Sequence, residues 1–255
     1  KRAERIRNVA QRIGAFLKHS PERVRWIETS GDKQALYSMP YYVGDVMATL
    51  AETGEATIYC SATLATPDLA PFMEGIGCED ALQLVARSPF DYQANALLYV
   101  PSRIDPGPKD AEFGVYLRTA MTALVAASKG GALLLFTSRQ QMNTMYGLMA
   151  GDLQKLHKLT VLHQDGKTNN QELVRQFKAD GNAVLFATRS FFEGVDIAGA
   201  ALRLVVLDKL PFEAPSPLGE AVQRAAGARA FERVTMPQMI VTLKQATGRL
   251  IRADT

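Results

Sequence analysis

The sequence is poor in cysteine and contains no long apolar run. Its 255 residues include two cysteines, Cys60 and Cys78, which are too few for a disulfide framework or a four-thiolate metal site. No segment approaches the roughly 18 to 20 uninterrupted apolar residues that cross a bilayer, and charges run through the N-terminal segment where a signal peptide would be apolar. These absences argue against a membrane or secreted protein, so we expect a protein of the reducing cytoplasm.

A large excess of one charge is also absent. Lys and Arg number 29 against 26 Asp and Glu, and the resulting net charge of +3 does not establish a polyanionic partner. Residues 1–25 are richer in positive charge, with eight Lys and Arg and two Glu, and their apolar residues recur at the spacing of an amphipathic helix. The basic face of this helix is either an ordinary solvated face or a contact for nucleic acid.

The second half of the chain alternates short apolar runs with helical patterns. Strands are expected at residues 132–136, 159–163, 183–187 and 202–207, and helices at 112–128, 140–149, 170–179, 218–231 and 237–250. Apolar strands that alternate with helices predict an α/β fold with a parallel sheet covered on both faces. Ligands of such sheets bind at the carboxyl ends of the strands.

The first half has a less regular pattern. Strands are expected at residues 24–28, 57–60 and 96–100, helices at 43–50 and 68–76, and a turn-rich stretch before Pro40. Residues 88–110 contain four prolines, a composition typical of a linker. We therefore predict a first domain at 1–90, a linker at 91–110 and a second domain at 111–255.

Hydroxyl and Arg side chains directly follow three of the expected strands. They are Ser61 and Thr63; Thr137, Ser138 and Arg139; and Thr188, Arg189 and Ser190. Ser and Thr at such turns often serve as plain helix caps, but the same positions also suit the binding of phosphate oxygens. The repetition after three strands favours phosphate binding.

The last helical segment carries a row of polar side chains. Gln245, Arg249 and Arg252 are separated by four and three residues, so they lie along one helix face. The two guanidinium groups either form surface salt bridges, for example with Glu193 and Asp196, or hold a triphosphate, where one Arg neutralises the charge that develops during phosphoryl transfer.

Five motifs together resemble one enzyme family. They are CSATL at 60–64, LFTSRQQM at 135–142, FATRSFFEGVDIAG at 186–199, LDKLPF at 207–212 and KQATGRLIR at 244–252. Their order and sequence are similar to those of superfamily 2 helicases of the DinG/XPD type, above all the bacterial DinG-like members. The resemblance implies two RecA-like motor domains, with ATP in the cleft between them and single-stranded DNA across them.

The resemblance also implies domain identities and DNA contacts. Residues 1–90 correspond to the end of motor domain 1, and 111–255 to most of motor domain 2. Ser61 and Thr63 match motif III, which couples the nucleotide site to DNA movement. The residues implied to contact DNA phosphates are Thr137, Ser138 and Arg139 of motif IV and Thr188 and Arg189 of motif V.

The nucleotide site is implied by the end of motif V and by motif VI. The expected ATP-binding residues are Glu193, Gly194, Asp196, Gln245 and Gly248. Arg252 matches the arginine finger, and Arg249 matches either a second contact to the γ-phosphate or a structural contact. Phe191 and Phe192 either pack under their loop or stack on bases, while His163 and Gln164 either bond a neighbouring loop or contact DNA.

Several family features are missing. The sequence has neither a Walker A motif nor the Walker B acid pair that holds Mg²⁺. Gly166, Lys167 and Thr168 end as a Walker A motif does, but Val161 stands where its first Gly belongs, so we expect an ordinary turn. The Mg²⁺ ligands are therefore expected outside this chain, and the family allows an iron–sulfur cluster there.

The expected function is ATP-dependent 5′ to 3′ translocation on single-stranded DNA by a helicase of DNA repair or replication. This chain is expected to be a fragment that does not hydrolyse ATP alone. A non-catalytic nucleic-acid-binding module is the alternative, and a preference for RNA or an RNA–DNA hybrid also stays open because phosphate contacts do not distinguish these strands.

Overall fold

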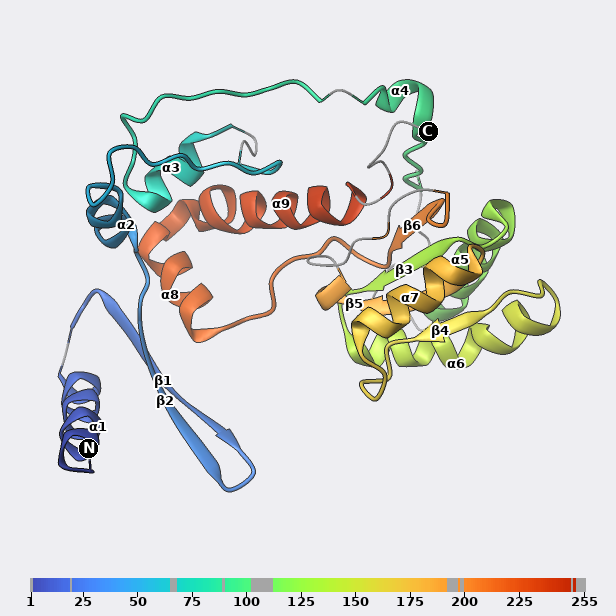
Figure 1. Ribbon diagram of the computed structural model, residues 1–255. Helices are drawn as coiled ribbons and strands as arrows, with labels where there is room; N and C mark the ends of the chain where they lie inside the picture. Colours follow the sequence, from blue (N-terminus) through green and yellow to red (C-terminus); the bar gives the residue numbers. More distant parts are fainter. Residues whose placement is uncertain are drawn as a thin grey trace. The chain divides into compact units, whose positions relative to one another are not determined.

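The computed structural model describes residues 2–18, 20–64, 68–88, 90–101, 112–191, 197, 200–248 and 250. They fall into two compact units (Figure 1). The first comprises Lys1–Val85 and Glu213–Gln238, and the second comprises Ala86–Phe212 and Met239–Thr255. The segment Glu213–Gln238, which lies inside the second domain predicted at 111–255, groups with the N-terminal residues.

The second unit is built on a four-stranded parallel sheet. The strand order is β4 (Val161–His163), β5 (Val184–Thr188), β3 (Ala132–Phe136), β6 (Leu204–Leu207). In register, Leu133 of β3 lies beside Leu185 of β5 and Val205 of β6. Every residue of β3 is buried, as expected for a central strand covered on both faces.

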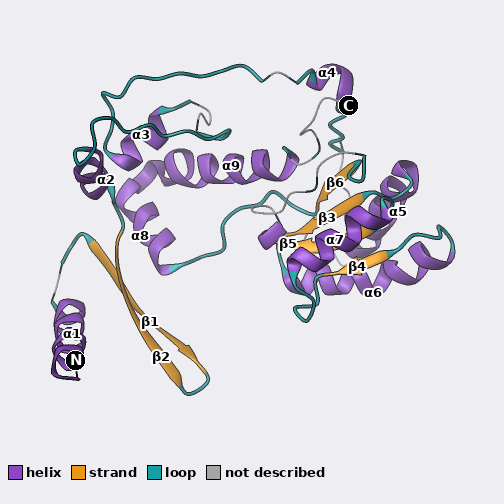
Figure 2. Cartoon of the chain, in the orientation of Figure 1, coloured by secondary structure: helices purple, strands orange, loops and turns teal. Residues whose placement is uncertain are grey.

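Alternate strand residues face two helical layers (Figure 2). Leu134, Phe136 and Phe186 pack in one cluster with α5 (Phe113–Ser128) and α6 (Arg139–Lys155). The other face packs against α7 (Asn170–Asp180) and Ala246 of α9 (Met236–Thr247). A parallel sheet between helices confirms the predicted α/β class.

The helices of this unit follow from spacing and caps. The buried residues of α6 recur at positions 142, 145, 149 and 153, which is one face of a helix. The Ser138 hydroxyl accepts a hydrogen bond from the Gln141 N–H at 3.1 Å, and the Asn169 side chain caps α7 by accepting from the Gln171 N–H at 2.9 Å.

Arg203 ties together the amino-terminal edge of the sheet. Its five N–H donors all find acceptors, at 2.7–3.1 Å. The acceptors are the carbonyl oxygens of Ser128, Lys129, Gly181 and Ala200 and the side-chain oxygen of Asn182. Because these residues lie in the segments that lead into β3, β5 and β6, one side chain connects the starts of three strands.

The first unit contains a hairpin and several helices. Its elements are α1 (Arg2–Leu17), β1 (Arg23–Ser30), β2 (Lys33–Pro40), α2 (Gly44–Ala51), α3 (Ala70–Ile76) and α8 (Pro217–Ala226). The strands β1 and β2 are antiparallel, and the rings of Trp26 and Tyr37 stack between them at 4.8 Å. Gly31, with φ of 58°, supplies the left-handed conformation that this two-residue turn requires.

The segment from α8 to α9 continues through short helical turns. A 3₁₀ turn (Gly227–Arg229) and a π-helical turn (Phe231–Thr235) connect the two helices. A further short helix, α4 (Tyr92–Asn95), belongs to the second unit, and a 3₁₀ turn, η1 (Arg189–Phe191), follows β5. None of the described helices is long and apolar enough to cross a membrane.

Three local predictions in the first half were wrong. The turn-rich stretch before Pro40 is strand β2. Residues 57–60 and 96–100 are not strands: Ile58 is 86% exposed and Leu97 is 91% exposed. Both segments have the apolar and aromatic composition of strands, but a strand also needs a pairing partner, and no described residue pairs with them.

Candidate nucleic-acid interface

The predicted strand-end residues of the second unit gather at the carboxyl edge of its sheet. Thr137, Ser138 and Arg139 follow β3. Thr188 is the last residue of β5, and Arg189 begins η1 directly after it. Because β3 and β5 are parallel neighbours, their carboxyl ends meet at the same edge. The structure therefore brings together all five residues that were predicted to contact DNA.

Gln164 organises this edge. Its side chain directly follows β4 and is 5% exposed. Its Oε1 accepts hydrogen bonds from the Thr188 backbone N–H at 2.9 Å and from the Thr188 hydroxyl at 2.8 Å. Its Nε2 donates to the Ser190 hydroxyl oxygen at 2.6 Å and to Asn170 Oδ1 at 3.2 Å. The predicted bond to a neighbouring loop is thus confirmed.

Asp208 fixes the other side of the edge. This residue directly follows β6, is 8% exposed, and accepts a hydrogen bond from the Thr137 N–H through Oδ1 at 2.9 Å. Burial raises the pKa of the Asp208 carboxyl, although the Thr137 N–H and the charge of Lys209 act in the opposite direction. Its second oxygen, Oδ2, is buried without a hydrogen-bond partner among the described residues.

Arg139 contributes an exposed cation at the first position of α6. A Cβ atom placed on Gly166 would lie 3.2 Å from the Arg139 Nη1, so the guanidinium reaches the turn that follows β4. The described residues contain one salt bridge, between Arg175 and Glu172, and Arg139 takes no part in it. Its charge is therefore not neutralised within the part of the chain that the structure describes.

The turn at Gly166, Lys167 and Thr168 is not a phosphate-binding loop. The Asp165 carboxylate accepts hydrogen bonds from the Lys167 N–H at 2.8 Å and from the Thr168 N–H at 3.1 Å. These bonds lower the pKa of Asp165. Because a carboxylate already binds the N–H groups that a phosphate would need, the predicted ordinary turn is confirmed.

A stacked histidine and a buried phenylalanine lie beside this edge. His163 Nε2 lies 2.9 Å from Asn143 Oδ1, its ring stacks on Tyr146 at 4.1 Å, and partial burial lowers its pKa. Phe191 is fully buried, which confirms that it packs under its loop. Phe192 lies outside the described residues.

The predicted nucleotide site is described only in part. Glu193, Gly194, Asp196, Arg249 and Arg252 lie outside the described residues, so their predicted roles and salt bridges are not tested.

Gln245 and Gly248, at the end of α9, are the described members of that predicted set. Gln245 Oε1 is buried without a described hydrogen-bond partner, and the Gly248 N–H donates to the Lys244 carbonyl at 2.9 Å. An unpaired acceptor fits a hydrogen-bond donor of a nucleotide or of a neighbouring residue. It does not fit a phosphate oxygen, which is itself an acceptor.

Ser61 and Thr63, the predicted coupling residues, belong to the first unit. Their hydroxyl oxygens lie 3.3 Å apart, and the Thr63 N–H also donates to the Ser61 hydroxyl oxygen at 3.3 Å. Among the described residues, no group of three or more His, Cys, Asp or Glu could hold a metal ion.

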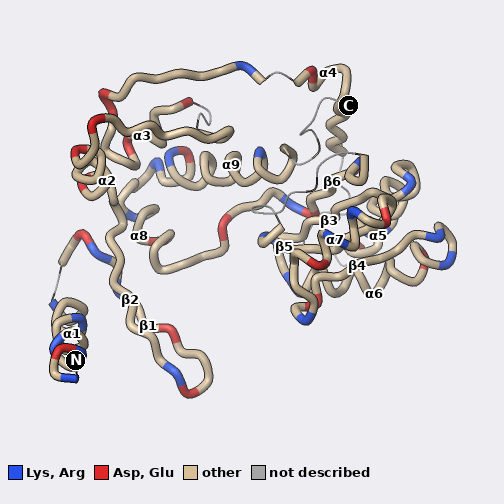
Figure 3. The backbone as a smooth tube through the Cα atoms, in the orientation of Figure 1, with Lys and Arg blue, Asp and Glu red and all other residues tan. Residues whose placement is uncertain are grey.

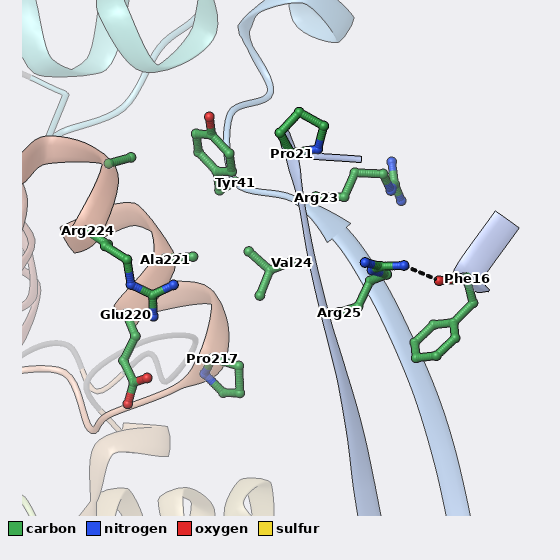
Figure 4. Close-up of a pocket in the computed structure, with 11 residues that line it drawn as sticks. Phe16, Pro21, Arg23, Val24, Arg25, Tyr41, Pro217, Glu220, Ala221 and Arg224 are labelled. Atoms are coloured by element: carbon green, nitrogen blue, oxygen red, sulfur yellow. Dashed lines mark hydrogen bonds between the residues drawn. The ribbon is translucent and has the colours of Figure 1, made fainter. Parts of the chain in front are cut away.

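A separate pocket of about 730 Å³ lies within the first unit, lined by residues of β1 and α8 and by the end of α1 (Figure 4). Arg23, Arg25 and Arg224 line it, but Arg25 donates to the Phe16 carbonyl at 2.7 Å and Arg23 to the Ser38 carbonyl at 2.6 Å. Two of the three guanidinium groups are thus engaged by the chain itself.

The basic face of α1 can still be either a solvated surface or a contact for nucleic acid. Lys and Arg residues lie along it (Figure 3), and none of its residues is buried. Ile6, on its apolar side, is 63% exposed. These features are compatible with a solvated face and with a nucleic-acid contact.

Asp208 was not among the residues predicted for the site. Ser190 was predicted only as one of the strand-end residues suited to phosphate binding, and Gln164 was left with two alternative roles. Asp208 and Gln164 carried a usable signal, because each is a polar residue directly after an apolar strand. The sequence gives no sign of which residues Gln164 bonds, because Thr188 and Ser190 lie 24 and 26 residues away from it.

Curated relatives match almost the whole chain. ATP-dependent DNA helicase YoaA of Escherichia coli is 37% identical over 89% of this chain and 36% of its own length. ATP-dependent helicase DinG of Mycobacterium tuberculosis is 30% identical over 98% of this chain and 39% of its own length. A relative named 3′-5′ exonuclease DinG, from Bacillus subtilis, is 28% identical over 93% of this chain and 27% of its own length. The chain thus spans about a third of the length of these relatives.

The structure and a family model agree with these relatives. A solved XPD helicase shares the fold with a TM-score of 0.59, at 17% identity, over 91% of this chain and 42% of that one. The family model of the helicase C-terminal domain matches residues 121–255, which is more than half of the chain. The chain therefore belongs to the helicase C-terminal domain family, among the superfamily 2 helicases of the DinG/XPD type.

Proposed function

We propose that the protein carrying this chain is an ATP-dependent DNA helicase that couples ATP hydrolysis to 5′ to 3′ movement on single-stranded DNA in repair or replication. Family membership and the names of the relatives support this function. The observation that carries it is the carboxyl edge of the sheet, where motif IV and motif V residues lie together.

The edge is suited to binding a nucleic-acid backbone without reading its sequence. It offers the Arg139 guanidinium, hydroxyl groups and the N-terminus of α6, and these groups bind phosphate oxygens in many nucleic-acid interfaces. Thr137, Ser138, Arg139, Thr188 and Arg189 are the proposed phosphate contacts. Phosphate binding of this kind follows a strand irrespective of base, as translocation requires.

The nucleotide would be bound by the proposed ATP-binding residues, which are Glu193, Gly194, Asp196, Gln245 and Gly248. Arg252 and Arg249 would stabilise the charge on the transferred phosphoryl group, and Ser61 and Thr63 would couple the two sites. The Walker A and Walker B residues are absent from the sequence, so Mg²⁺ binding and hydrolysis require residues from elsewhere in the protein. The chain alone is therefore proposed to be inactive.

The experiment is a measurement of ATP hydrolysis by the full-length gene product with and without single-stranded DNA. We predict strong stimulation by DNA, and a loss of about three decades in rate for Arg252→Ala, or roughly 4 kcal/mol at 1.36 kcal/mol per decade. DNA affinity should stay nearly unchanged. Arg118→Ala, at an exposed position of α5, is the matched control and should keep full activity.

Two other outcomes would change the proposal. If neither the wild type nor the variant hydrolyses ATP, the protein is a non-catalytic nucleic-acid-binding module of helicase fold. If Arg252→Ala weakens DNA binding and hydrolysis equally, Arg252 is a DNA-binding or structural residue. Affinities for matched DNA, RNA and RNA–DNA hybrid oligomers decide which strand the protein prefers.

A further inference from the structure

The bonds around Gln164 determine which way its amide points. The Thr188 backbone N–H is always a donor, so the atom that faces it at 2.9 Å must be the amide oxygen. The amide nitrogen then faces the Ser190 hydroxyl oxygen at 2.6 Å and Asn170 Oδ1 at 3.2 Å, and both atoms can accept. The reversed orientation would place two donors against each other.

This orientation assigns the hydroxyl hydrogens of Thr188 and Ser190. The Thr188 hydroxyl lies 2.8 Å from the amide oxygen, which only accepts, so Thr188 donates its hydrogen to Gln164. Ser190 has the opposite role, because its oxygen accepts from Gln164 Nε2 and, at 3.4 Å, from Asn170 Nδ2. Its own hydrogen finds no acceptor among the described residues.

The position of Ser190 suits a donor to an external anion. Its side chain is exposed, while the next residue, Phe191, is fully buried and anchors the turn. A donor held in place by a buried amide and a buried ring loses little conformational entropy when it binds. Thr188, by contrast, has used both its N–H and its hydroxyl hydrogen within the protein, and a phosphate oxygen can only accept.

We propose that Ser190 supplies the hydroxyl donor to a backbone phosphate of the bound strand, and that Thr188 positions this loop through Gln164 without contacting the phosphate itself. The inference rests on the proposed function and changes its assignment of motif V contacts. Ser190 is a binding residue, and Gln164 and Thr188 are positioning residues.

The test is the affinity of the full-length gene product for fluorescein-labelled oligothymidylate, measured by fluorescence anisotropy. Ser190→Ala should raise Kd roughly tenfold, the loss expected for one hydrogen bond to a charged group. Ser190→Thr, which keeps the hydroxyl, should stay within about threefold of the wild type. Thr188→Val, which keeps the side-chain shape but removes the donor to Gln164 Oε1, should raise Kd less than Ser190→Ala does, because Thr188 acts on the bound strand only through the position of the loop. Melting temperatures of all variants identify any loss that comes from unfolding.

A second measurement locates the contact on the strand. Oligothymidylates with one neutral methylphosphonate linkage at successive positions should reveal one position that weakens wild-type binding and no longer weakens binding of Ser190→Ala. This loss of coupling is the signature of a direct contact, and a merely structural role for Ser190 would not produce it.

The outcomes separate this inference from the proposed function. A wild type that binds oligothymidylate while Ser190→Ala binds equally well overturns the role of Ser190 alone. If folded Thr188→Val loses about tenfold in affinity while Ser190→Ala binds as tightly as the wild type, Thr188 is the phosphate contact. A wild type that binds no single strand overturns the proposed function as well.

Discussion

The two edges of the parallel sheet differ in how they use their polar groups. At the amino-terminal edge, all five donors of Arg203 bind acceptors of the same chain. At the carboxyl edge, Gln164 and Asp208 also tie neighbouring segments together. Three groups there have no partner among the described residues: the Ser190 hydroxyl hydrogen, the Arg139 charge and Asp208 Oδ2.

This difference indicates that the amino-terminal edge of the sheet contributes to stability and the carboxyl edge to binding. At the starts of β3, β5 and β6, all five N–H donors of Arg203 are used by acceptors of the described chain. The ends are held in place by two buried side chains, whose bonds fix the direction of the remaining free groups. A ligand that supplies acceptors can bind at the carboxyl edge without breaking any bond described there, which agrees with the general location of ligand sites in such sheets.

The largest expected effect is on the amino-terminal edge. Arg203→Met removes five hydrogen bonds, and we expect the free energy of unfolding to fall by about 2 kcal/mol, while Kd for single-stranded DNA stays within about twofold of the wild type. Urea denaturation and anisotropy measure the two quantities. Arg118→Met, at an exposed Arg of α5, is the control and should change neither. A large rise in Kd for folded Arg203→Met would contradict the separation of the two edges.

The next effect is on the carboxyl edge. Arg139→Ala removes one cation from the proposed interface, so the slope of log affinity against log salt concentration should decrease in magnitude by about 0.7, with little change in stability. Anisotropy titrations over a range of salt concentrations give the slope, with Arg118→Ala as the control. An unchanged slope would remove Arg139 from the set of phosphate contacts.

The smallest effect concerns Asp208 and depends on pH. Its pKa is raised in the folded protein, so the folded state holds this proton more tightly than the unfolded chain does. The contribution of Asp208 to the free energy of unfolding is fully present below its pKa in the unfolded chain. It is lost as pH rises through its pKa in the folded protein. Asp208→Asn should therefore gain stability relative to the wild type as pH rises through this window, as measured by denaturation at several pH values. If the difference in unfolding free energy between Asp208→Asn and the wild type stays constant over this pH range, folding does not shift the pKa of Asp208.

The regular part of the second unit was readable from the sequence. The four strands were predicted within two residues, because each is an apolar run of the length that a buried parallel strand requires. The carboxyl-edge residues were found because polar side chains follow these runs. Strand β2 was missed, since Lys33, Gln34, Ser38 and Pro40 interrupt any apolar pattern there.

The remaining features depend on contacts that no local pattern encodes. Residues 96–100 have strand composition but no described partner, so propensity alone was misleading. The bond from Gln164 to Thr188 joins residues 24 positions apart, and its direction follows from atoms on both sides. The grouping of Glu213–Gln238 with the first unit is likewise a matter of packing between distant segments.

Hydrogen–deuterium exchange of the full-length gene product, with and without saturating oligothymidylate, compares the two edges directly. We predict that peptides covering residues 137–139 and 188–190 become protected by the oligonucleotide, and that peptides covering 129–131 and 181–182 keep their exchange rates. Protection of the amino-terminal edge, or unchanged exchange at the carboxyl edge while the oligonucleotide is bound, would contradict the assignment of the carboxyl edge as the nucleic-acid interface.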